Sequence, residues 1–165
     1  MEIIDYNGEG RWTKDSIIQR YFEYCKRFHV TPCDLKPRES VAGERKWIYP
    51  VMDTVIAGVK QGDKACQQIA VEFIEEDQKI PFGKGLKSNA ARALRQNHLA
   101  LSETDKVRIR KRVVSLLVRG LVPHEFREYA KLLRKIGLAD CKEQLAAIDK
   151  TNPYVEKFCK YLIES

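Results

Sequence analysis

The chain has 165 residues, the usual length of one domain, and at that length it needs neither disulfides nor a metal for stability. Hydrophobic residues make up 44% of the sequence and charged residues 32%, which argues against intrinsic disorder. No apolar run approaches the ~20 residues of a membrane span. The acidic start at residues 1–5 leads into no apolar segment, so we expect neither a membrane association nor a secretory signal.

The first part of the chain predicts an extended arm followed by a capped helix. Residues 3–8 carry an Asn-Gly turn signal and predict an arm or one strand. Thr13 is a suitable helix cap, and apolar residues at i, i+4 and i+7 intervals predict a helix from there to about Phe28. Residues 31–32 predict a helical turn at most. The segment 36–46, which contains a proline and a glycine, predicts a loop.

Two helices in close succession are predicted next. The first begins near Pro50, and Gly62 can supply the left-handed residue that ends it. Asp63 then caps the second, which runs to about Asp77. Because the connection between them is so short, we expect an antiparallel helical hairpin. After a break at 81–85, the helical pattern resumes.

Five more helix starts follow, four of them marked by a polar cap or an early proline. These starts are Leu86, Ser102, Pro123, Asp140 and Asn152. The elements together predict an all-α fold, a compact bundle of about seven to eight helices arranged partly as antiparallel hairpins, with a short extended N-terminal arm. We expect a single domain over 1–165. The alternative is a subdivision into an N-terminal arm, helix and loop (1–46) and a helical core (47–165).

Cysteine and histidine usage predicts no metal site. The five cysteines are odd in number and widely spaced, as expected for reduced thiols used as small core residues in the cytoplasm. Cys25, His29 and Cys33 have a spacing that could align metal ligands on a helix, but the break expected after His29 and the lack of a fourth ligand favour a plain helix end. We therefore expect no metal and no cofactor.

No catalytic motif is evident either. The sequence contains no G-x-S-x-G, no H-E-x-x-H and no paired C-x-x-C. The pair 124–125, His-Glu, is expected to be a surface capping pair rather than an acid/base pair. Residues 83–88, GKGLKS, lack the spacing of a phosphate-binding loop, and although a helix start there could hold one phosphate, a plain loop is the better prediction. Whether the chain is an enzyme is left open, with a binding role favoured.

The positive charge is concentrated in one third of the chain. Residues 82–136 contain 14 Lys and Arg against four Asp and Glu, a net charge of +10. Residues 1–81 carry a net charge of −2 and residues 137–165 a net charge of −1, so that this basic segment supplies the whole excess of +7. Such a concentration predicts a polyanionic partner.

Helical periodicity places these basic side chains in stripes. On each of the three helices expected in the basic segment, apolar residues share one side and Lys and Arg another. The stripes consist of Lys84, Lys87, Arg92, Arg95, Arg108, Lys111, Arg112, Arg119, Arg127, Lys131, Arg134 and Lys135. Arg110 falls on an apolar side, where we expect a paired or snorkelling arginine.

Residues 113–126, VVSLLVRGLVPHEF, resemble the helix, glycine turn and helix that open several helix-turn-helix domains. The resemblance implies that the helix starting at Asp140 would lie in the major groove of DNA. The sequence departs from that pattern, because the helix after Pro123 is longer than usual and the helix from Asp140 carries more acid than base. Backbone contact through the basic helices is therefore expected rather than base reading.

These patterns favour a non-enzymatic helical protein that binds DNA or RNA by nonspecific backbone contact through residues 84–135. The alternative is a protein–protein interaction module whose basic face docks an acidic partner protein. The sequence leaves open the choice between DNA and RNA, and the oligomeric state. It also predicts that Arg108, Lys111 and Arg112 lie on a free helix face, so that their reversal to Glu would abolish binding without unfolding the protein.

Overall fold

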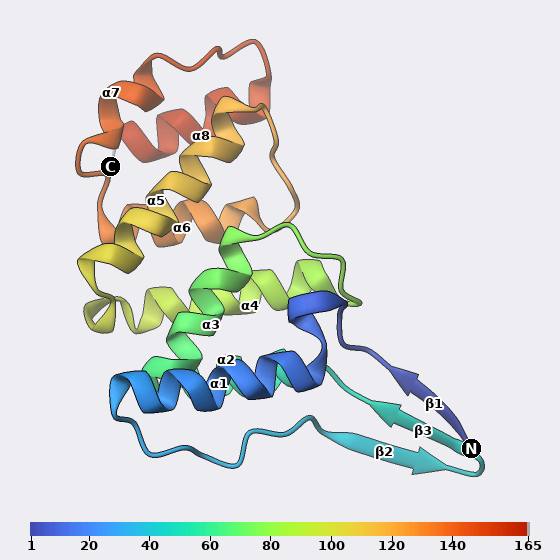
Figure 1. The fold of residues 1–165 in the computed structure, drawn as a ribbon. Coiled ribbons are helices and arrows are strands. Elements are labelled where there is room, and N and C mark those ends of the chain that lie inside the picture. The colour runs from blue at the N-terminus through green and yellow to red at the C-terminus, as the bar shows by residue number, and fades with distance from the viewer. Residues whose placement is uncertain (165) are drawn as a thin grey trace.

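The computed structural model describes residues 1–164, which form eight α-helices and a small three-stranded sheet (Figure 1). Helices account for 62% of the structure. The expectation of a mostly helical fold is therefore confirmed, whereas the all-α class is incomplete because it leaves out the sheet. Among the described helices, none is both long enough and apolar enough to cross a bilayer.

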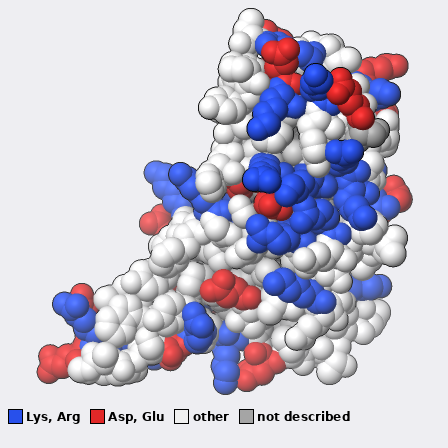
Figure 2. All heavy atoms as spheres, turned by 180° about the vertical axis from the view of Figure 1, so that it is seen from behind, with Lys and Arg blue, Asp and Glu red and all other residues white. Residues whose placement is uncertain are grey.

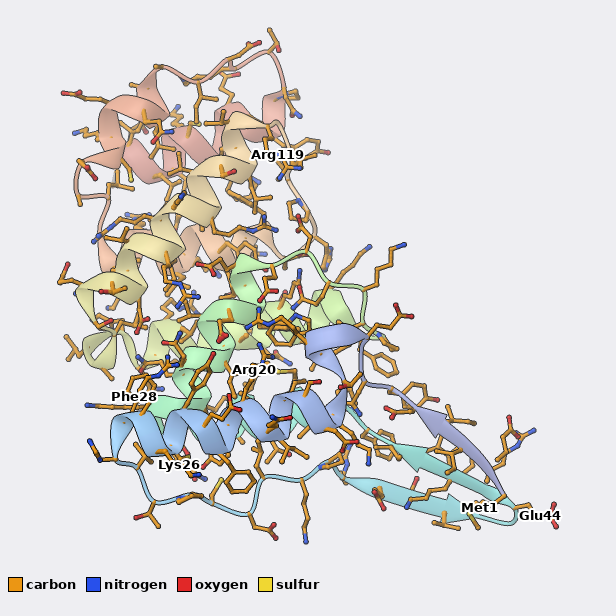
Figure 3. The ribbon with its side chains drawn as sticks, viewed as in Figure 1. Met1, Arg20, Lys26, Phe28, Glu44 and Arg119 are labelled. Atoms are coloured by element: carbon orange, nitrogen blue, oxygen red, sulfur yellow. The ribbon has the colours of Figure 1, made fainter. Side chains whose placement is uncertain are left out.

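The sheet forms an arm that extends away from the helices (Figure 1). Its strands are β1 (Glu2–Asp5), β2 (Glu39–Ala42) and β3 (Arg45–Ile48). They lie in the order β1–β3–β2, with β1 parallel and β2 antiparallel to β3. Met1 and Glu44 lie together at the tip of the arm (Figure 3). The extended N-terminal arm predicted from the sequence is thus one strand of this sheet.

The hairpin of β2 and β3 replaces the loop predicted over 36–46. Gly43, with φ of 61°, and Glu44 connect the two strands. A glycine in the first position of a two-residue connection is typical of a hairpin turn. All four residues of β2 are exposed, so no alternation of apolar and polar residues marks this strand in the sequence. The helical turn expected at 31–32 is also absent from the structure, where these residues have no regular secondary structure.

Helix α1 (Lys14–Phe28) begins where the sequence predicts. The Thr13 hydroxyl accepts a hydrogen bond from the Ser16 N–H at 3.2 Å, which satisfies a free backbone group in the first turn. The buried side of α1 consists of Ile17, Tyr21, Tyr24 and Cys25. Phe22 of the same helix, although apolar, is 42% exposed. The helix ends at His29, which has a left-handed backbone with φ of 55°.

Helices α2 (Val51–Lys60) and α3 (Lys64–Glu75) pack against each other as the expected helical hairpin. The Asp63 carboxylate caps α3 by accepting the first N–H groups of that helix, at 2.9 and 3.1 Å. The two helices approach closely at Gly58, because a Cβ atom there would collide with the Cys66 sulfur. The hairpin therefore depends on a residue without a side chain at this position.

The second half of the chain forms five helices. They are α4 (Gly83–Gln96), α5 (Glu103–Val118), α6 (Phe126–Ile136), α7 (Cys141–Ala146) and α8 (Pro153–Ile163). The caps predicted at Ser102 and Asn152 are confirmed, since both side chains accept a backbone N–H. The helix start predicted at Asp140 is confirmed, but its polar cap is wrong, because the Asp140 side chain makes no capping hydrogen bond.

The packing of these helices places α6 between α4 and α8. Helix α5 packs against α3, α6 and α7. In Figure 1, α4 and α6 lie behind α3 and α5. One continuous cluster of buried apolar side chains, from Trp12 to Leu162, fills the space between the helices. The three helices of the basic segment thus lie in two layers, with α5 in front of α4 and α6 in this view.

A buried carboxylate ties α1 to α3. Glu72 is 4% exposed and accepts hydrogen bonds from the Tyr24 hydroxyl at 2.7 and 2.8 Å. Two guanidinium groups also reach it, Arg11 at 2.9 Å and Arg20 at 3.4 Å. Arg20 lies on the side of α1 that faces α3 (Figure 3), and its guanidinium is 4.5 Å from the centre of the Trp12 ring. Glu72 therefore compensates the charge of Arg20, whose side chain is only 12% exposed.

The cysteines are all free thiols, and their accessibility differs sharply. Cys33 is exposed, whereas Cys25, Cys66 and Cys159 are buried, and burial raises the pKa of these three thiols. Because the thiolate is the reactive form, we expect a thiol-specific disulfide reagent at about pH 8 to modify Cys33 first in the folded protein. A Cys33→Ser variant should lack this fast phase. Several thiols reacting at the same fast rate would contradict the packing described above.

Candidate nucleic-acid interface

Three cations from α4 and α6 gather around one carboxylate. Glu128 of α6 lies 3.5 Å from Arg92, 3.4 Å from Arg95 and 3.8 Å from Lys131. Its side chain is 12% exposed, whereas that of Arg92 is 41% exposed. The single negative charge is therefore largely covered by the cations that it holds in place. The charge that this cluster exposes to solvent is mainly positive.

Further cations extend this surface along α6. Arg127, Arg134 and Lys135 are exposed, and within residues 1–164 no carboxylate lies within 4 Å of them. We call the surface formed by Arg92, Arg95, Arg127, Lys131, Arg134, Lys135 and Lys157 the basic face. Figure 2, which views the molecule from behind Figure 1, shows a dense group of Lys and Arg with few acidic residues among them.

A groove with aromatic walls opens beside α6. It has a volume of about 390 Å³ and lies between α6 and α8. Its lining consists of Arg127, Lys131, Lys157, Phe158 and Tyr161. The Arg134 guanidinium is 4.7 Å from the centre of the Tyr161 ring, and the Lys157 ammonium is 5.8 Å from that of Phe158. At such distances the cations are attracted to the ring faces.

The α8 residues of this groove were not predicted from the sequence. Residues 137–165 carry a net charge of −1, and this average hides one lysine that lies next to the basic helices. The periodicity of α8 contained a usable signal, because Lys157 and Tyr161 are four residues apart and share one side of the helix. Only the packing of α8 against α6 shows that this side borders the basic face.

The basic residues of α5 are arranged differently. Arg108 donates two hydrogen bonds to the Glu75 carboxylate, at 2.7 and 2.8 Å, and Arg112 forms an ion pair with Asp77. These arginines lower the pKa of Glu75 and of Asp77. The expectation that Arg108 and Arg112 lie on a free face is wrong, because both are bound to carboxylates of α3 or of the segment that follows it. Reversing them to Glu would place like charges together and disturb the fold.

Arg110 lies on the opposite side of α5, where its side chain binds the C-terminal end of α6. Its guanidinium donates hydrogen bonds to the carbonyl of Gly137 at 2.8 Å and to that of Ile136 at 3.1 Å. These carbonyls belong to the last residue of α6 and to the residue that follows it, where a positive charge is favoured. The paired arginine predicted from its position on the apolar side is confirmed. Its role is to hold α6 against α5.

The remaining cations of the predicted stripes lie outside the basic face. Lys111 lines a separate groove between α5 and α7, and Arg119 is exposed at the end of α5 (Figure 3). Lys87 is 7% exposed, donates a hydrogen bond to the Glu76 carbonyl at 3.2 Å and has a pKa lowered by burial. Lys84 is exposed at the start of α4, about 12 Å along the helix from Arg92. The structure thus brings together Arg92, Arg95 and the four cations of α6.

No family model, curated protein or solved structure matches this chain. The part of the chain that the structure describes contains no group of three or more His, Cys, Asp or Glu that could hold a metal ion. Helix α7, which corresponds to the helix expected from Asp140, has six residues and packs against α5 and α8.

Proposed function

We propose that this protein binds nucleic acid through the phosphate backbone, using the basic face. The observation that supports this most directly is the arrangement around α6. Three of the seven cations of the basic face, Arg92, Arg95 and Lys131, surround one largely covered carboxylate, Glu128. The other four lie exposed on α6 and α8. A surface of this kind attracts a polyanion and gains affinity by releasing the counterions condensed on it.

Backbone contact fits this arrangement better than base reading. The cations come from different turns of three helices, α4, α6 and α8, and so they spread over the surface instead of converging on one base pair. Arginine and lysine contacts to phosphate position a protein without reading sequence. Glu128 holds Arg92 and Arg95 by ion pairs, which restricts their side chains before a ligand arrives. We therefore propose binding with little sequence preference.

The proposal predicts a steep dependence of affinity on salt. If about five of the cations contact phosphates, affinity for duplex DNA should fall by roughly 10²- to 10³-fold between about 50 and 200 mM salt. Fluorescence anisotropy with labelled DNA and RNA, in duplex and single-stranded form, measures this dependence. Scrambling the nucleotide sequence should change the affinity little. No detectable binding at about 50 mM salt would contradict the proposal.

An acidic protein partner is the other outcome of such experiments. The purified protein can be used to retain ligands from a lysate, with and without nuclease treatment. Under the proposal, most retained material is nucleic acid, and nuclease removes it together with any proteins bound to it. Retention of one acidic protein regardless of nuclease, combined with no affinity for nucleic acid, would assign the basic face to protein docking.

A further inference from the structure

The groove between α6 and α8 brings ring faces and cations together within the basic face. Arg127 and Lys131 line it from α6, and Lys157, Phe158 and Tyr161 line it from α8. Its volume of about 390 Å³ lies within the usual range of small-molecule sites, roughly 300–1,000 Å³. Both rings are half-buried and are wall residues of the groove.

We infer that this groove binds an unpaired nucleotide, and that the ligand of the basic face is therefore a single strand of nucleic acid. The inference rests on the proposed function and adds to it the form of the ligand. Every nucleotide base has an aromatic face, so an aromatic wall beside a cationic surface suits bases of any sequence. The base would lie in the groove while the phosphates of the strand contact Arg127, Lys131 and Lys157.

The two aromatic residues have different surroundings. The Phe158 ring packs edge-on against Phe126, with ring centres 4.8 Å apart, which anchors it to the buried core. Tyr161 instead has the Arg134 guanidinium over its ring, at 4.7 Å. A guanidinium plane stacks on bases as an aromatic ring does. Tyr161 and Phe158 therefore supply the rings that line the groove, and Arg134, stacked on Tyr161, adds a guanidinium plane next to it.

A single strand fits this groove better than a duplex. Bases in a duplex are stacked on one another and paired, so their faces are unavailable unless the helix opens, which costs free energy. A single strand exposes base and phosphate at once. The groove opens among the cations of α6, so one strand crossing α6 would present phosphates to the basic face and a base to Tyr161. Duplex ligands would use the cations alone.

The test compares strands that have bases with strands that lack them. Labelled oligonucleotides of about 12 residues are used as homopolymers of thymidine or uridine, as abasic strands with the same backbone, and as duplexes. The wild-type protein is expected to bind the base-containing single strand about tenfold more tightly than the abasic strand. Deoxyribose and ribose strands are compared in parallel. A higher affinity for the base-containing strand than for the abasic strand, in either series, supports the inference.

Variants of Tyr161 assign this gain to the groove. Tyr161→Leu keeps an apolar side chain. Its affinity for the base-containing strand should fall to that for the abasic strand, and its affinity for the abasic strand should equal that of the wild type. Tyr161→Phe should preserve the gain and shows that the ring, not the hydroxyl, is required. Equal wild-type affinity for abasic and base-containing strands overturns the inference and leaves the proposed function standing. If none of the strands binds, the proposed function fails as well.

Discussion

Replacing Glu72 with alanine is expected to lower the free energy of unfolding by about 3 kcal/mol. The substitution removes a carboxylate that is 4% exposed and leaves its partners in place. Arg20, whose side chain is 12% exposed, would lose the ion pair at 3.4 Å, and the Tyr24 hydroxyl would lose its acceptor. A buried cation left without compensation is more costly than the pair is favourable.

The loss should come mainly from Arg20 and Tyr24. Arg11 also contacts Glu72, but its side chain is 51% exposed and water can replace the lost ion pair. Glu72→Gln should be less destabilising than Glu72→Ala, because the amide oxygen still accepts a hydrogen bond from Tyr24. Denaturant unfolding of the wild type, Glu72→Ala and Glu72→Gln, monitored by circular dichroism, gives these differences in stability.

A matched control is available on α1. Glu23 is exposed, and its carboxylate receives a long hydrogen bond from Gln19 at 3.4 Å. Glu23→Ala should change stability by no more than about 0.5 kcal/mol. Equal losses for Glu72→Ala and Glu23→Ala would mean that the buried carboxylate does not join α1 to α3 as the structure indicates.

Helix positions could be predicted from the sequence because their start signals are local. Thr13, Asp63, Ser102 and Asn152 each cap a helix by accepting a backbone N–H a few residues away, and this depends on little else. The sheet depends on distant partners instead. β1 pairs with β3, which lies more than 40 residues later in the chain, and β2 has no buried side chain to mark it. Pairing of this kind leaves little trace in a single sequence.

The candidate site could likewise be predicted only in part from the sequence of the basic segment. Helical periodicity correctly separates charged from apolar sides, but it does not reveal which element covers each side. The α5 stripe faces acidic residues at 75 and 77, so Arg108 and Arg112 are used in the fold. The α6 stripe faces solvent. Both look alike in the sequence, because the neutralising carboxylates come from the preceding part of the chain, whose net charge is −2.

Reversing three cations of α6 is expected to reduce nucleic-acid affinity by at least about a hundredfold at ~0.1 M salt. The variant carries Arg127→Glu, Arg134→Glu and Lys135→Glu, and all three wild-type side chains are exposed. Removing about three phosphate contacts should also make the dependence of log affinity on log salt shallower by roughly 3 units. The fold should be preserved, because substitutions on an exposed helix surface usually change stability little.

The control variant changes the net charge equally, elsewhere on the molecule. It carries Lys26→Glu, Lys60→Glu and Lys64→Glu, at exposed positions of α1, α2 and α3. Both variants lower the formal net charge by the same amount, so a general loss of attraction for polyanions affects them alike. Their melting curves and circular dichroism spectra should match those of the wild type. Any difference in binding between the two variants then reports where the ligand lies.

The most direct test of the basic face is to compare the wild type, the α6 variant and the control variant in their affinity for one labelled single strand at ~0.1 M salt. Fluorescence anisotropy is suited to the measurement. The wild type and the control variant should bind with affinities within about tenfold of each other, because long-range attraction is largely screened at this salt. The α6 variant should bind at least about a hundredfold more weakly than the wild type. Equal losses in both variants would contradict a dedicated face and show that the ligand responds to net charge alone.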